Sequence, residues 1–138
     1  MNTYSIKDEQ FKQTSLFKDF QKENPSFGYL RIRAYSASEA IPIPGVQITI
    51  STIFQNNKIV YFEGETDSSG LIDRISLPTP KLVLDNLDEP NKIIYELKTV
   101  YEKENINQTY EVNMYEGICT VQNINITPSQ KESDSLWL

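Results

Sequence analysis

The chain has 138 residues, a formal net charge of −6 and no histidine. This length fits one domain with a real hydrophobic core. The acidity argues against a nucleic-acid partner, whose phosphates require a basic surface. Without histidine, Ser-His-Asp and Cys-His catalysis are excluded and the commonest metal ligand is missing. The sequence therefore predicts no catalytic, cofactor-binding or metal-binding residue.

The single cysteine, Cys119, cannot form an internal disulfide. It lies in a strand-like run, and we expect its side chain to be buried as a small apolar group. The first residues contain no apolar segment of the kind found in signal peptides, and no apolar run approaches the length of a membrane span. We therefore expect synthesis in the cytoplasm and no membrane insertion.

The N-terminal segment divides into two parts. Residues 1–13 are polar and weakly patterned, and we interpret them as a flexible lead-in. Residues 14–23 predict a short helix, because Thr14 or Ser15 can cap it and a proline follows its end. Its apolar side contains Leu16, Phe17 and Phe20. A helix this short must dock, either on its own domain or on a partner, and both alternatives stay open.

Seven later segments have the period-two alternation of half-buried strands, with turn signals between them and no crossover helix. They cover residues 29–36, 46–54, 58–66, 71–77, 93–102, 109–115 and 118–127. This arrangement predicts an all-β fold, a seven-stranded Greek-key β-sandwich with a short N-terminal helix.

One bend organises this pattern. The stretch Ile41 to Ile50 reads Ile-Pro-Ile-Pro-Gly-Val-Gln-Ile-Thr-Ile, and its prolines and glycine predict a corner. Val46 and the two following alternate apolar residues then predict a strand with one buried face. The Asp67–Gly70 turn is a second marker, because Asp can bond its own backbone and Gly accepts a left-handed conformation.

Two strands carry further predictions. On the outer face of residues 29–36, Arg31 and Arg33 alternate with tyrosines. They are either a ligand-binding strip or a solvated face with acidic cross-strand neighbours, and the second is the simpler interpretation. Within residues 118–127 the apolar positions change from odd to even. This change predicts a β-bulge near Gln122 or Asn123.

Two acidic groups, Asp85/Asp88/Glu89 and Glu65/Asp67/Asp73, lack the spacing of an EF-hand, and we predict no calcium site there. The tail is polar and then abruptly apolar. Its last residues, Leu136, Trp137 and Leu138, either dock on a partner or fold back on the domain.

The motifs Gly28–Ile32, Ala40–Val46, Thr66–Leu71 and Val121–Pro128 resemble those of carboxypeptidase regulatory-like (transthyretin-like) β-sandwich domains. Around them, Phe20–Pro25 and Leu77–Pro80 are similar to a version in anaerobic spore-forming bacteria. There it occurs as small proteins and beside spore cortex-lytic enzyme regions. The resemblance implies a module without catalytic residues. It divides the chain into residues 1–27 (lead-in and helix), 28–128 (sandwich) and 129–138 (tail).

These observations predict a non-enzymatic protein-interaction or structural module, associated with the spore or envelope. The alternatives are a glycan- or peptidoglycan-binding module and a structural subunit of a phage-derived or spore-layer assembly. We expect protein partners, with glycan as an alternative, and the oligomeric state stays open. The predicted docking residues are Leu16, Phe17, Phe20, Leu136, Trp137 and Leu138.

Overall fold

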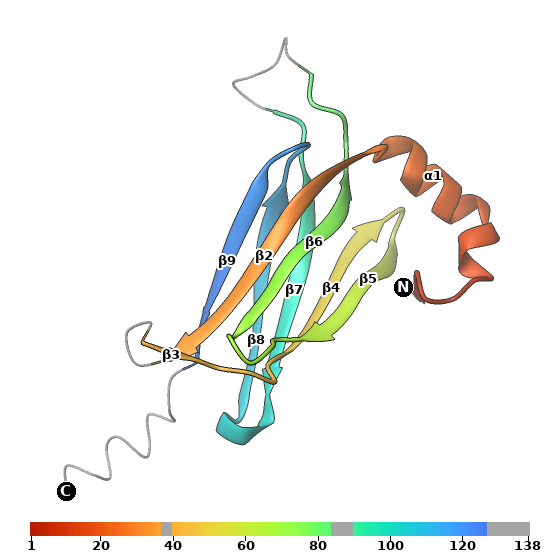
Figure 1. The fold of residues 1–138 in the computed structure, drawn as a ribbon. Coiled ribbons are helices and arrows are strands. Elements are labelled where there is room, and N and C mark those ends of the chain that lie inside the picture. The colour runs from red at the N-terminus through yellow and green to blue at the C-terminus, as the bar shows by residue number, and fades with distance from the viewer. Residues whose placement is uncertain (37–39, 84–89, 127–138) are drawn as a thin grey trace, which may run out of the picture.

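The protein folds as two β-sheets with a short helix at one end (Figure 1). The structure is a computed structural model and describes residues 1–36, 40–83 and 90–126. Its strands are β1 (Thr3–Ser5), β2 (Ser26–Ser36), β3 (Ile41–Pro42), β4 (Gln47–Phe54), β5 (Asn57–Glu65), β6 (Leu71–Thr79), β7 (Ile93–Tyr101), β8 (Ile106–Met114) and β9 (Cys119–Asn125). The α-helix is α1 (Ser15–Glu23), and 3-10 turns cover Phe11–Gln13 and Glu102–Glu104.

The five-stranded sheet has the order β1-β5-β4-β7-β8. In the second sheet, β2 lies at the centre, pairing with β6 and β3 in antiparallel fashion and with β9 in parallel. The predicted β-sandwich is confirmed, and each of the seven predicted segments contains a strand. The described residues contain nine strands rather than seven, because the short strands β1 and β3 join the sheets.

The core lies between the two sheets and is built from the alternate residues of each strand. On β2 the buried positions are Leu30, Ile32 and Ala34, and on β4 they are Ile48 and Ile50. The main cluster consists of Leu30, Ile32, Ala34, Val46, Ile48, Ile50, Ile75, Leu77, Tyr95, Leu97, Val112, Met114, Ile124 and Ile126. The opposite residues of the same strands therefore face outward and are available for function.

The predicted corner and the predicted turn are bonded to each other. The Thr66 hydroxyl donates to the Ile43 carbonyl at 2.8 Å and accepts from the Val46 N–H at 3.0 Å. The Asp67 carboxylate accepts from the N–H groups of Ser69 and Leu71. These bonds hold the start of β4 against the connection between β5 and β6, and this connection runs from one sheet to the other.

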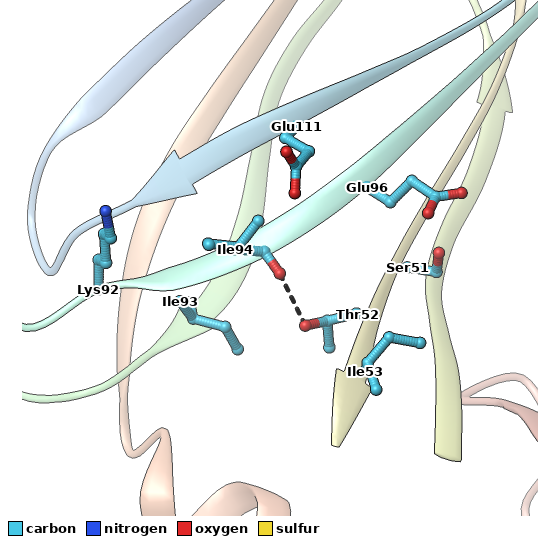
Figure 2. A pocket seen from close by; sticks show the side chains of 8 residues that line it. All are labelled: Ser51, Thr52, Ile53, Lys92, Ile93, Ile94, Glu96 and Glu111. Atoms are coloured by element: carbon cyan, nitrogen blue, oxygen red, sulfur yellow. Dashed lines mark hydrogen bonds between the residues drawn. The ribbon is translucent and has the colours of Figure 1, made fainter. Parts of the chain in front are cut away.

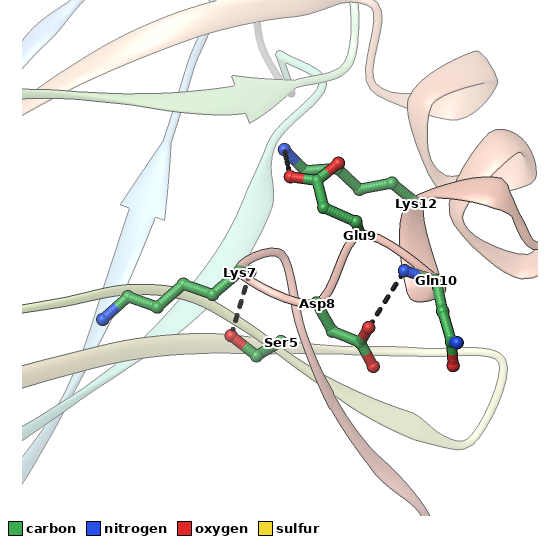
Figure 3. Close-up of polar contacts among 6 residues, drawn as sticks. All are labelled: Ser5, Lys7, Asp8, Glu9, Gln10 and Lys12. Carbon is green, nitrogen blue, oxygen red and sulfur yellow. Dashed lines mark hydrogen bonds and ion pairs between the residues drawn. The ribbon is translucent and has the colours of Figure 1, made fainter.

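The N-terminal segment is ordered, which corrects the prediction of a flexible lead-in. β1 adds a parallel strand to the edge of β5, and a turn then leads into the 3-10 turn and α1. Figure 3 shows the contacts that shape this turn: the Ser5 hydroxyl accepts from the Lys7 N–H and the Asp8 carboxylate from the Gln10 N–H. The alternation of a three-residue strand is too short to detect in sequence.

Helix α1 packs on its own domain, beside the β4–β5 hairpin (Figure 1). The Thr14 hydroxyl caps it by accepting from the Phe17 N–H. Its Phe20 ring is fully buried and meets the Phe54 ring edge-on, with 5.4 Å between the centroids. A second core cluster, made of Phe11, Phe17, Phe20 and Ile59, closes this end of the sandwich.

The carboxy-terminal strand differs from its prediction. β9 pairs with β2 from Cys119 to Asn125 without a register shift, so the bulge predicted near Gln122 or Asn123 is wrong. Cys119 is exposed, which contradicts its predicted burial. The reason is that β9 is an edge strand whose odd residues, including Val121 at 54% exposure, point to solvent. Because Cys119 and Val121 are apolar, the sequence pattern wrongly predicted that they face the core.

Some predictions fall on residues outside the described ranges. They concern the acidic group at 85–89 and the tail from 129 to 138. Within the described ranges, no helix is long and apolar enough to cross a membrane.

We predict that Phe20→Ala lowers the free energy of unfolding by about 3–5 kcal/mol, because it empties the centre of the second cluster. Urea denaturation followed by circular dichroism measures the change. The control is Phe27→Ala, since Phe27 is 46% exposed and its loss should change stability by about 0.5 kcal/mol at most. Equal losses in the two variants would contradict the packing of α1.

A second prediction concerns alkaline pH. Burial, with a smaller contribution from Tyr61, raises the pKa of Tyr95 far above its usual 10.0, and the Tyr95 hydroxyl donates to the Pro78 carbonyl at 2.6 Å. The unfolded chain loses this proton near pH 10 while the folded protein keeps it. Tyr95 therefore stabilises the fold fully below pH 10, and this contribution falls above pH 10 by about 1.4 kcal/mol per pH unit.

A comparison with the variant Tyr95→Phe isolates the contribution of the Tyr95 hydroxyl to stability. The variant should be less stable by about 1–3 kcal/mol at neutral pH, since the Pro78 carbonyl loses its donor. Above pH 10 its stability should fall less steeply than that of the unaltered protein. Parallel slopes in urea titrations between pH 9 and 11 would show that Tyr95 ionises as freely folded as unfolded.

Candidate functional site: an arginine–tyrosine face

All three arginines of the chain lie on the outer side of the sheet centred on β2. They are Arg31 and Arg33 on β2 and Arg74 on β6. Tyr29 and Tyr35 share this side, and we call these five residues the arginine face. The remaining ten of the 13 basic residues are lysines. Guanidinium groups are thus restricted to one surface of the protein.

The alternation of β2 places four of these side chains. Leu30, Ile32 and Ala34 are buried, so the residues between them must point away from the core. Arg31 and Arg33 are two residues apart, which separates their Cα atoms by about 7 Å. The face is therefore as well fixed as the core on the reverse side of the same strand.

A β-bulge places Arg74. Leu30 pairs with Ile75 and Ile32 with Ile72, so two residues of β6, Asp73 and Arg74, lie opposite one residue of β2. Arg74 has a φ of 59°, in the left-handed region that side-chain-bearing residues seldom adopt. Bulges redirect side chains and increase local twist. Here the bulge brings a third guanidinium onto the face.

Aromatic rings hold two of the guanidinium groups. The Arg74 guanidinium lies over the Tyr29 ring at 4.5 Å from the centroid, and that of Arg33 lies over Tyr35 at 5.0 Å. At an exposed site each contact contributes about 0.5–1 kcal/mol. Stacking uses the flat side of a guanidinium and leaves the N–H groups at its edge able to donate to a ligand.

The face carries an acid as well. The Arg31 Nε lies 3.5 Å from an Asp73 carboxylate oxygen, and 46% and 68% of these side chains are exposed. Water screens a pair this exposed, so it contributes little to stability. Among the described residues, no acid forms an ion pair with Arg74. Unlike Arg31, Arg74 therefore carries a positive charge that no described acid neutralises.

Strand β9 gives the face an apolar margin. In the parallel register Val121 lies opposite Arg31, and Cys119 lies opposite Tyr29. Both side chains are exposed. A ligand held by Arg31 would thus have an apolar surface beside it.

The residues predicted for partner docking lie elsewhere. Phe17 and Phe20 are 6% and 0% exposed in the cluster beneath α1, and Leu16 packs against the same cluster. The two rings thus present almost no surface to a partner. Leu136, Trp137 and Leu138 lie outside the described residues. The part of the chain that the structure describes contains no cluster of three or more acidic or cysteine side chains suited to a metal ion.

Sequence reasoning identified Arg31 and Arg33 but missed Arg74. A signal was present, because the inward apolar residues of β6 change phase between Ile72 and Ile75, a spacing of three. The same phase argument, applied to residues 118–127, gave a bulge that does not exist.

We predict that Arg74→Gly leaves the protein folded and changes its free energy of unfolding by less than about 1 kcal/mol. Glycine adopts a positive φ without strain, which offsets the lost contact with Tyr29. Arg74→Val should cost more, because a β-branched residue resists this conformation. Thermal unfolding compares the two, and a larger loss for glycine than for valine would contradict the bulge geometry.

No family model matches the sequence, and no curated protein matches it either. Solved structures resemble the fold. Catechol 1,2-dioxygenase from Pseudomonas arvilla C-1 is 8% identical with a TM-score of 0.48, and that from Acinetobacter sp. ADP1 is 10% identical with a TM-score of 0.46. In both comparisons 94% of this chain aligns with 58% of the enzyme.

A 3-chlorocatechol 1,2-dioxygenase from Rhodococcus opacus 1CP is 13% identical with a TM-score of 0.34, over 72% of this chain and 59% of that one. The similar structures are enzymes, whereas the sequence analysis predicted a non-enzymatic interaction or structural module. At these identities the likeness concerns the all-β sandwich and supplies no activity to this chain.

Proposed function

We propose that this protein binds a small ligand carrying a phosphate group on the arginine face. The observation that carries the proposal is the gathering of all three arginines on one side of one sheet. The third reaches it only through a left-handed residue in a bulge. Backbone strain of this kind persists where the surrounding structure requires it, and it is concentrated at functional sites.

The use of arginine rather than lysine on this face supports a ligand with a phosphate group. A guanidinium presents its donors in a planar fork that matches two oxygens of a phosphate, whereas a lysine acts as a point charge. Tyr29 and Tyr35 restrict the orientation of two of these forks. Pre-ordered donors lose less conformational entropy when a ligand binds.

The dimensions and charge of the protein support a small ligand. The two arginines of β2 lie about 7 Å apart along the strand, a distance that suits one phosphate or a diphosphate. The net charge of −6 repels a long polyanion from the protein as a whole. The exposed Val121 provides an apolar contact for the remainder of the ligand.

For the fold we propose the carboxypeptidase regulatory-like type of sandwich. Support comes from the bonds between its two markers, the Thr66 hydroxyl linking Ile43 to Val46 and the Asp67 carboxylate closing the turn before β6. A protein partner, incorporation into a spore, synthesis in the cytoplasm and the lack of enzymatic activity all stay predictions.

Titration with inorganic pyrophosphate at constant ionic strength tests the proposed function. We expect saturable binding by isothermal calorimetry, and at least about tenfold weaker binding by Arg74→Gly, because a charge-assisted contact contributes about 1.5–3 kcal/mol. Arg31→Lys keeps the charge and removes the fork, so it should weaken binding as well.

The control is Lys98→Gln, which removes an exposed cation from the five-stranded sheet and should leave the affinity unchanged. If Arg74→Gly, Arg31→Lys and the control bind pyrophosphate equally well, the arginine face is not the site. If the unaltered protein shows no saturable binding, the proposal is wrong.

A further inference from the structure

A groove of about 500 Å³ lies on the five-stranded sheet, away from the arginine face (Figure 2). Strands β4 and β7 pair from Gln47 with Val100 to Ser51 with Glu96, and beyond this point the ladder between them stops. The Thr52 hydroxyl donates to the Ile94 carbonyl at 2.8 Å and replaces the missing backbone pairing. The strands are thus joined there by a side chain, and the groove lies over this junction.

Two carboxylates lie at one end of the groove. Glu96 on β7 and Glu111 on β8 are directly paired in register, and both line it. Side chains paired in this way have Cβ atoms about 5 Å apart, and like charges in such a pair repel each other. The Lys58 ammonium forms an ion pair with Glu96 at 3.9 Å, whereas no cation among the described residues pairs with Glu111. A cation placed between the two acids would relieve the repulsion.

A serine hydroxyl lies beside these acids. Ser51, the register partner of Glu96, is 3% exposed and lines the groove. Its hydroxyl makes no hydrogen bond to any residue that the structure describes. The Ser51 hydroxyl is therefore able to accept a hydrogen bond from a ligand at the acidic end of the groove.

The other end of the groove has the opposite charge. Ile94 and Glu96 lie on the outer side of β7, and Lys92 comes just before this strand. At extended spacing the Cα atoms of Lys92 and Glu96 are about 13 Å apart. Figure 2 shows the Lys92 ammonium at the end away from both carboxylates. Between the ends, Ile53 and Ile94 are 55% and 45% exposed. The groove is acidic, then apolar, then basic.

We propose that this groove binds a linear zwitterion with a primary ammonium at one end, an apolar chain and a carboxylate at the other. The three N–H donors of the ammonium match three acceptors: the carboxylates of Glu96 and Glu111 and the hydroxyl of Ser51. The chain of the ligand lies along Ile53 and Ile94, and its carboxylate faces Lys92. This site is independent of the proposed phosphate site, because it lies on the other sheet.

Four probes separate the parts of this proposal: 6-aminohexanoate, hexylamine, 1,6-diaminohexane and hexanoate. The zwitterion should bind most tightly and hexylamine less tightly. The diamine should bind more weakly still, because its second ammonium meets Lys92, and hexanoate should not bind. Backbone amide shifts of Ile53 and Ile94 in ¹⁵N-labelled protein measure each affinity.

Variants test the assigned contacts. Glu111→Gln and Ser51→Ala should each weaken 6-aminohexanoate about tenfold, whereas Lys92→Gln should remove the preference for the zwitterion over hexylamine. Glu65→Gln and Lys98→Gln are matched controls, since both side chains lie outside the groove, and they should change nothing. Arg74→Gly should also bind normally, which distinguishes this site from the arginine face.

Two results would overturn the proposal. One is the absence of saturable shifts at Ile53 and Ile94 with 6-aminohexanoate. The other is an equal response to all four probes, which would indicate nonspecific contact with the apolar middle alone.

Discussion

The alternation of β2 is the constraint on which the rest of this structure depends. The strand is paired on both sides, with β6 and β3 on one and β9 on the other. Paired strands cannot rotate, so every second side chain is committed to the core. The same commitment directs Arg31 and Arg33 outward, and one periodic segment thereby supplies both a stabilising surface and a charged one.

Features that depend on local alternation could be predicted from the sequence. The seven longer strands, the cap at Thr14 and the burial of Val46, Ile48 and Ile50 all follow from residue spacing and turn chemistry. The positions of Arg31 and Arg33 follow in the same way. In each case the information lies within about ten consecutive residues, where side-chain period and backbone preference agree.

Features that depend on distant partners could not be predicted. β1 forms because the edge of β5 is available to pair with it, and a sequence of three residues contains no pattern that predicts this pairing. Cys119 is exposed because β9 lies at an edge, a fact about neighbours rather than about its own pattern. The groove on the other sheet needs the divergence of β4 from β7, a property of pairing. The position of Arg74 depends on both kinds of information. Its bulge arises from pairing with β2, but the spacing of three residues between Ile72 and Ile75 indicates it in the sequence.

The parallel pairing of β2 with β9 has a consequence for how the chain folds. Tyr29 pairs with Cys119, so the contact joins residues that are 90 positions apart in the sequence. Closing so long a segment costs chain entropy before the pairing repays it, and folds rich in such contacts form slowly. During synthesis, β2 leaves the ribosome long before its second neighbour and exposes an open edge in the interval. Aggregation of nascent chains is therefore most probable in that interval, and faster docking of β9 would shorten it.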